Sequence, residues 1–191
     1  MKYSYLFMAP GFEEIEAITP IDVMRRAGMD VKSVSVTDDP NVTGANGITV
    51  TTDLTIDQIN DEDIEWLICP GGMPGASNLA DCPKLIEMLG RHNASGGRIA
   101  SICAAPAVVL EKAGILKGHK VTCYPGFETM IKDAEVTGEP VVVDGNVITA
   151  KGPAMALRFA LAIVAESMGA DAANEIAMGM QVLSNSKCYQ Y

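Results

Sequence analysis

The segment of this chain most suited to chemistry is an apolar strand that ends in a cysteine. It reads Arg98-Ile-Ala-Ser-Ile-Cys103-Ala-Ala-Pro106, and a helical pattern begins almost at once behind the cysteine. A strand that turns sharply into a helix is typical of a nucleophile elbow, which holds one side chain at the carboxyl end of a sheet. The first N–H groups of such a helix and its dipole favour a thiolate, so we expect the pKa of Cys103 to lie below the free-thiol value of roughly 8.5. The alternative is a small buried residue at a strand end.

Two other apolar strands end in loops that could serve the same site. The first leads through Ala9-Pro10-Gly11 into a helix that carries Glu16 in its opening turns, and the second ends in Cys69-Pro70-Gly71-Gly72. Paired glycines let backbone N–H groups approach a ligand, which is how an oxyanion site is built. Each feature also has an ordinary reading, because turns use Pro-Gly-Gly and helix N-termini favour acidic residues.

The wider pattern alternates strands with helices from one end of the chain to the other. A mostly parallel sheet between helical layers follows from that alternation, and sites in such sheets lie at the carboxyl ends of the strands. Strands are expected at 3–8, 31–36, 48–51, 64–69, 98–102, 120–123, 141–143 and 147–150, and helices at about 13–27, 85–92 and 154–168.

Bulk properties favour a single domain over residues 1–183, followed by a polar tail over 184–191. The net charge of −10 argues against nucleic-acid and anionic-membrane partners. The N-terminal apolar run is too short for a signal peptide or membrane span, so a cytoplasmic protein is expected. Neither a phosphate-binding glycine loop nor a Cys/His ligand cluster occurs, and we expect no nucleotide, no other cofactor and no metal.

Four motifs together resemble the ThiJ/PfpI superfamily, within the branch of the parkinsonism-associated protein and its bacterial relatives. The resemblance is collinear over roughly residues 3 to 168 and implies a flavodoxin-like three-layer sandwich, usually a homodimer. It implies a reactive elbow cysteine, here Cys103, hydrogen-bonded to a buried protonated glutamate, here Glu16. It also implies oxyanion donors at the N–H groups of Gly72 and Ala104. The motifs are Ala9-Pro10-Gly11-Phe12-Glu13-Glu14-Ile15-Glu16, Cys69-Pro70-Gly71-Gly72, Ala100-Ser101-Ile102-Cys103-Ala104-Ala105-Pro106 and Lys151-Gly152-Pro153.

One position departs from that branch, which commonly has a histidine where this chain has Tyr124. The two histidines, His92 and His119, are most simply solvated surface residues, so a Cys–His dyad of the protease type is not expected. Tyr124 would then serve as an orienting hydroxyl or as an edge of the pocket. The other residues assigned to a possible pocket are Gly71, Lys151, Gly152 and Pro153.

The remaining cysteines and the oligomeric state complete these expectations. Cys123 is either core filling, the favoured interpretation, or a resolving thiol, while Cys69 and Cys82 are expected to be structural. Cys188 falls in the polar tail. The resemblance and the supply of apolar surface predict a homodimer whose contact surface is the first helix, with Ile15, Ile18 and Val23.

Two classes of function compete for this site. The favoured one is a cofactor-independent enzyme of glyoxalase or deglycase type, in which Cys103 adds to a small aldehyde or glycated substrate and Glu16 shuttles a proton. The second is an oxidative-stress sensor or redox-regulated chaperone, in which Cys103 is oxidised. A cysteine amidase or peptidase is a third possibility, against which the absent histidine counts.

Overall fold

A computed structural model describes residues 2–182, so the expected tail at 184–191 and Cys188 lie outside the described residues. Seven strands form the main sheet in the order β10-β11-β7-β6-β1-β2-β5, and every neighbouring pair is parallel except β10 with β11. These strands are β1 (Tyr3–Met8), β2 (Val31–Ser35), β5 (Leu54–Thr55), β6 (Ile64–Cys69), β7 (Arg98–Ile102), β10 (Val141–Asp144) and β11 (Val147–Ala150).

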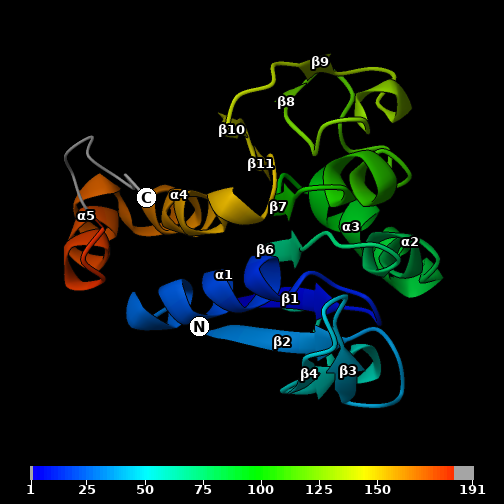
Figure 1. The fold of residues 1–191 in the computed structure, drawn as a ribbon, viewed down its shortest axis with the longest axis horizontal. Helices are drawn as coiled ribbons and strands as arrows, with labels where there is room; N and C mark the ends of the chain where they lie inside the picture. The colour runs from blue at the N-terminus through cyan, green and yellow to red at the C-terminus, as the bar shows by residue number, and fades with distance from the viewer. Residues whose placement is uncertain (1, 183–191) are drawn as a thin grey trace.

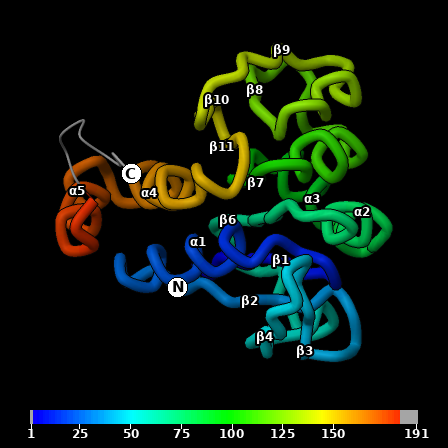
Figure 2. Tube along the Cα trace, viewed as in Figure 1, coloured from blue at the N-terminus to red at the C-terminus, as the bar shows by residue number. Residues whose placement is uncertain are grey.

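Two small sheets of two strands each lie outside the main one. An antiparallel pair joins β3 (Asn41–Thr43) to β4 (Thr49–Thr51), and a parallel pair joins β8 (Lys120–Val121) to β9 (Glu135–Val136). In Figure 2 the first pair lies beside the end of β2, and the second lies at the far end of the molecule, beyond β10.

Helices cover the main sheet on both sides. Figure 1 shows α1, α4 and α5 gathered on one side and α2 and α3 on the other, which makes the three layers of the expected sandwich. The α-helices are α1 (Glu14–Arg26), α2 (Gly75–Ala80), α3 (Pro83–Ala94), α4 (Ala156–Met168) and α5 (Ala170–Gly179); the short helices are the 3-10 turns Ile56–Gln58, Glu128–Met130 and Pro153–Met155 and the π-helix Pro106–Leu110.

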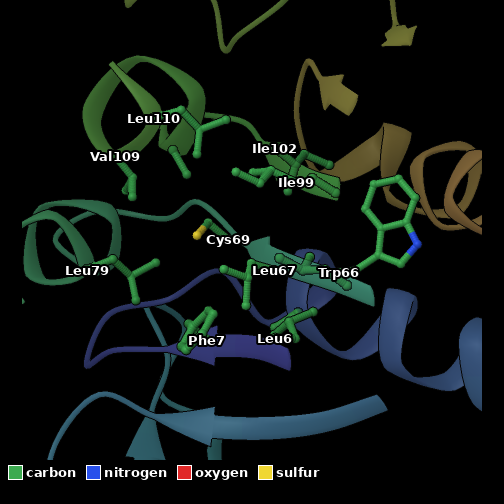
Figure 3. Packing of buried hydrophobic residues seen from close by; sticks show 14 of the residues in the cluster. Leu6, Phe7, Trp66, Leu67, Cys69, Leu79, Ile99, Ile102, Val109 and Leu110 are labelled. Atoms are coloured by element: carbon green, nitrogen blue, oxygen red, sulfur yellow. The ribbon is translucent and has the colours of Figure 1, made fainter. Parts of the chain in front are cut away.

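The core lies around the central strands β1, β6 and β7. Strands covered on both faces are apolar on both, and the fully buried Leu6, Phe7 and Leu67 show this (Figure 3). The Trp66 indole N–H donates to Oγ of Ser167 across 2.8 Å, which ties the sheet to α4. This rigid interior fixes where each strand ends, and the strand ends carry the site.

The alternating pattern predicted these central strands correctly, whereas several other expectations were wrong or incomplete. The helix expected behind Cys103 is only the π-helix Pro106–Leu110 followed by turns. The chain continues beyond α4 into α5, which packs on α4 and was not expected. Val23 is fully buried within the protomer, so its assignment to a dimer surface was wrong. No helix within residues 2–182 has the length and apolarity to cross a membrane.

Candidate active site

The carboxyl ends of three neighbouring parallel strands bring the expected chemical groups together. Strand β1 leads through its loop to Glu16 in the first turns of α1, strand β6 ends before Gly71 and Gly72, and strand β7 ends before Cys103. A methyl group built on Gly71 would lie 2.6 Å from Cβ of Cys103, 2.8 Å from Oε2 of Glu16 and 3.0 Å from the backbone N of Ala104. Gly71 therefore lies in contact with all three groups, and there is no room for a side chain at this position.

Cys103 sits in a strained turn that its neighbours hold in place. Its φ is +65°, in the left-handed region that costs a non-glycine residue roughly 1–2 kcal/mol. The Cys103 N–H donates to the Ala150 carbonyl across 2.9 Å, and its own carbonyl accepts the Tyr124 N–H across 2.8 Å. This is the geometry of the expected nucleophile elbow. Ala150 had not been assigned a role, although its position as the last residue of a predicted neighbouring strand was a usable signal.

Glu16 is completely buried, and it faces the glycine loop. Its Oε2 accepts the Gly71 N–H across 2.8 Å, while Oε1 has no hydrogen-bond partner among residues 2–182. Burial raises the pKa of Glu16 to about 7, although the hydrogen bonds from Gly71 and Cys103 oppose that rise. A carboxyl with such a pKa exchanges its proton near neutral pH, as a general acid or base must. Sequence reasoning had assigned Gly71 only to the pocket, not to the carboxyl.

Glu13 and Glu14 have separate, structural roles. The Glu13 carboxylate caps α1 by accepting the Glu16 N–H across 2.8 Å. Glu14 is buried and accepts both the backbone N–H and the side-chain amide of Asn46, across 2.7 and 2.8 Å, which fixes the β3–β4 hairpin to α1. Neither group meets Cys103.

The pKa of the Cys103 thiol is raised to about 12, which corrects the expectation of a low value. Burial is the largest cause and the charge of Glu16 the second, and together they outweigh the N–H groups of Gly72 and Ala104, which lower the pKa. The expected helix dipole is weak because the helix behind the cysteine has only five residues. Both N–H groups lie close enough to the sulfur to lower its pKa, and their role as oxyanion donors stays a prediction.

The thiol and the carboxyl therefore titrate as one unit. While Glu16 is ionised, a thiolate at Cys103 is repelled, and once Glu16 is protonated that repulsion is gone. Around neutral pH the pair holds one readily movable proton.

Tyr124 and Gly152, two of the expected pocket residues, lie against each other. The Tyr124 ring is 45% exposed and packs against Gly152, where an added methyl group would lie 3.2 Å from the ring. Of the two other expected pocket residues, Lys151 donates its ammonium to the Gly138 carbonyl across 3.3 Å, and Pro153 begins a 3-10 turn. Lys151 is thus not aimed at Cys103.

The histidines are not the free surface residues that were expected. Nε2 of His92 is 3.2 Å from the Arg98 carbonyl at the opposite end of β7 from Cys103, and burial lowers the pKa of His92. Nδ1 of His119 is 3.2 Å from the Asp144 carboxylate. Cys123 is 3% exposed and belongs to the hydrophobic core, in agreement with the favoured interpretation of that residue as core filling.

Residues 2–182 contain no group of three or more His, Cys, Asp or Glu side chains arranged to hold a metal ion. Two cavities lie away from the elbow: one of about 150 Å³ touches His92 and Ser95, and one of about 370 Å³ touches Pro83 and Lys112. The groups gathered at the elbow are the Cys103 thiol, the Glu16 carboxyl and the backbone N–H groups of Gly72 and Ala104.

Comparison with known proteins shows the family of this chain. Residues 2–166 match the model of the DJ-1/PfpI family. DJ-1 homolog B of Arabidopsis thaliana is 35% identical over 170 residues, which cover 88% of this chain and 39% of that protein, so the chain spans about two fifths of that relative's length. The glutathione-independent glyoxalase DJR-1.2 of Caenorhabditis elegans is 36% identical over 170 residues, covering 86% of this chain and 87% of that protein.

The fold is shared with solved structures. The oxidized DJ-1 of Toxoplasma gondii is 35% identical and superposes with a TM-score of 0.91, with 100% of both chains covered. This likeness and the mostly parallel, helix-flanked sheet confirm the predicted flavodoxin-like α/β class.

Proposed function

Because this chain belongs to the DJ-1/PfpI family, we propose that it is a cofactor-independent cysteine enzyme acting on small reactive carbonyls, of glyoxalase or deglycase type. The observation that carries the proposal is the buried Glu16 carboxyl, with a pKa of about 7, beside the strained Cys103. The similar glutathione-independent glyoxalase of Caenorhabditis elegans supports it.

The proposed reaction converts methylglyoxal and water into lactate. The Cys103 sulfur bonds to the aldehyde carbon while its proton passes to Glu16, and Glu16 returns that proton to the new alkoxide, which gives a hemithioacetal. Glu16, again a carboxylate, then removes the proton from that carbon and delivers it to the former ketone carbon, while the hydroxyl proton passes to the former ketone oxygen, leaving a thioester of lactate. Water cleaves the C–S bond, which releases lactate and restores the thiol. The N–H groups of Gly72 and Ala104 stabilise the negative charge that develops.

Lactate release from methylglyoxal, compared between the wild type and Cys103→Ser, tests this proposal. Wild type should release lactate and Cys103→Ser should release almost none. Glu16→Gln retains an acceptor for the Gly71 N–H but cannot carry the proton, so turnover should fall by about 10²–10⁴-fold. Equal rates in wild type and Glu16→Gln would mean that Glu16 only positions the sulfur.

A redox sensor is the second candidate, and the amide donors at Cys103 favour it. Hydrogen peroxide would convert the thiolate to a sulfenate with loss of water, and a second peroxide would give a sulfinate, whose oxygens Gly72 and Ala104 could hold. One similar solved structure is described as oxidized. The raised thiol pKa weighs against this role, because oxidation needs the thiolate.

A homodimer is proposed through the first helix. Ile15 and Ile18 are 54% and 41% exposed, and both lie in the first turns of α1. Exposed aliphatic residues three apart share one helix face, which suits self-association. Sedimentation should give about twice the 20.2 kDa protomer mass, and Ile15→Glu with Ile18→Glu should give the protomer. A wild-type protomer at micromolar concentration would refute the dimer.

A further inference from the structure

The segment that leaves strand β8 is anchored to strand β11 and to Cys103. The Thr122 N–H donates to Oγ1 of Thr149 across 2.9 Å, and both residues are buried. Two residues later the Tyr124 N–H donates to the Cys103 carbonyl across 2.8 Å. The position of Tyr124 is thus fixed relative to the reacting sulfur by backbone bonds.

The Tyr124 ring leaves an aromatic surface open beside the elbow. One part of it packs on Gly152, two residues beyond the Ala150 carbonyl that holds the Cys103 N–H. Phe127 meets the ring edge-on, with centroids 6.4 Å apart and planes at 77°. The Phe127 N–H donates to the Tyr124 carbonyl across 3.1 Å, so one tight turn holds both rings. Nearly half of Tyr124 still faces solvent.

The charges near this surface do not suit an anionic substrate. Glu16 is buried, and Glu128 accepts the Gly126 N–H across 2.7 Å within the same turn. Lys151 is the one cation among the assigned site residues, and its ammonium donates to Gly138. A carboxylate or phosphate on the substrate would meet carboxylates here, whereas a neutral aromatic group would find a ring to pack against.

We propose that Tyr124, supported by Phe127, is a specificity-determining residue that makes aryl-substituted dicarbonyls such as phenylglyoxal better substrates than methylglyoxal. The inference rests on the proposed carbonyl chemistry at Cys103. An aryl group on the ketone carbon packs on the Tyr124 ring while the sulfur attacks the aldehyde carbon. Packing of two aromatic rings contributes enough for a preference of about threefold to tenfold beyond the intrinsic reactivity of the two aldehydes.

Turnover of the two aldehydes gives the first test. The ratio of kcat/KM for phenylglyoxal to that for methylglyoxal should fall by about threefold to tenfold in Tyr124→Ala and stay near wild type in Tyr124→Phe. Tyr3→Ala, which removes a ring at the start of β1, should leave the ratio unchanged. A loss in Tyr124→Ala that is equal for both aldehydes, or no loss for either, would overturn the inference.

A second test does not depend on turnover. Phenacyl bromide and bromoacetone both alkylate a thiol: the C–S bond forms, the C–Br bond breaks, bromide leaves with the electron pair, and the thiol proton passes to Glu16 or water. The rate at Cys103, measured by peptide mass spectrometry and divided by the rate at glutathione, should favour phenacyl bromide in wild type and Tyr124→Phe but not in Tyr124→Ala. If wild type turns over neither aldehyde yet keeps this preference, the proposed function fails and the aromatic surface stands. If wild type shows no preference for phenacyl bromide, the inference that the Tyr124 ring binds aryl groups is refuted.

Discussion

Gly71 donates its N–H to Oε2 of Glu16 across 2.8 Å, and the same glycine leaves no room for a side chain between that carboxyl and Cys103. Gly71 thus orients the Glu16 carboxyl and sets its distance from Cys103. Its neighbour Gly72, at φ +87°, is equally confined, since an added methyl group there would lie 2.4 Å from the Glu13 backbone N.

Gly71→Ala should therefore damage both stability and activity. The new methyl group would lie 2.6 Å from Cβ of Cys103, so the loop must shift, at a cost of about 1–3 kcal/mol in the free energy of unfolding. Gly90→Ala is the matched control, because its methyl group would lie 3.9 Å from the nearest atom, the Ala113 carbonyl oxygen, and it adds up to about 1 kcal/mol of helix propensity. Urea unfolding and lactate release check both variants; a Gly71→Ala protein as active and stable as wild type would show that the loop is not confined.

The raised pKa of Glu16 predicts a pH-dependent stability difference between wild type and Glu16→Gln. Folded protein keeps this carboxyl protonated up to about pH 7, whereas the unfolded chain loses the proton near the ordinary glutamate pKa of 4.5. The contribution of Glu16 to the free energy of unfolding is therefore complete below pH 4.5. It falls by on the order of 3 kcal/mol as the pH rises toward 7. Glutamine does not titrate.

Glu16→Gln should accordingly gain stability relative to wild type as the pH rises from 4 to 8. Urea unfolding of the two proteins across that range measures the difference, in which the other titrating groups cancel. A difference between Glu16→Gln and wild type that is constant with pH would mean that Glu16 titrates normally in the folded protein.

In Glu16→Gln, alkylation of Cys103 should begin at a lower pH than in the wild type, because the negative charge beside the thiol is gone. Burial and the Glu16 carboxylate both raise the pKa of the thiol, so Glu16→Gln removes one of the two causes. Iodoacetamide rates against pH, followed on the Cys103 peptide, should show a wild-type inflection above the free-thiol value of roughly 8.5 and a lower one in Glu16→Gln. An inflection well below 8.5 in wild type would show that the Gly72 and Ala104 donors outweigh burial.

The backbone strain at Cys103 predicts an order of stability between two inactive variants. At φ +65° a β-carbon is costly and glycine is not, so Cys103→Gly should be more stable than Cys103→Ala by up to about 1 kcal/mol. Urea unfolding of the two variants, neither of which has a thiol, checks this. If Cys103→Ala is the more stable variant, the positive φ at this position does not destabilise the folded protein.

The sequence predicted the central strands and the residues at their ends because burial on both sides leaves an unmistakable apolar run. Strands β1, β6, β7 and β11 begin and end where the pattern placed them. Short edge elements such as β5 and β9 were missed, since two residues carry no periodicity. Helix α5 was missed because Gly169 was read as a final stop, although it ends one helix and begins the next.

The thiol pKa could not be predicted from local pattern for a different reason. The elbow motif indicated amide donors, and Gly72 and Ala104 do provide them. Desolvation depends on how completely distant segments cover the sulfur, and the Glu16 charge comes from a residue far along the chain. The local sequence indicates the N–H donors but not the surroundings that desolvate the sulfur. It therefore predicted a lowered pKa for the Cys103 thiol, whereas the structure raises it.

The bond from the Cys103 N–H to the Ala150 carbonyl also sets an order of events during synthesis. Strand β11 follows strand β7 in the chain by more than forty residues, yet it lies beside β7 in the sheet. A nascent chain that has not yet reached Ala150 lacks the acceptor that fixes the elbow, while the cysteine has already been made. The nucleophile is therefore assembled only when the last strand of the sheet is in place, and premature termination before Ala150 yields a thiol without its site.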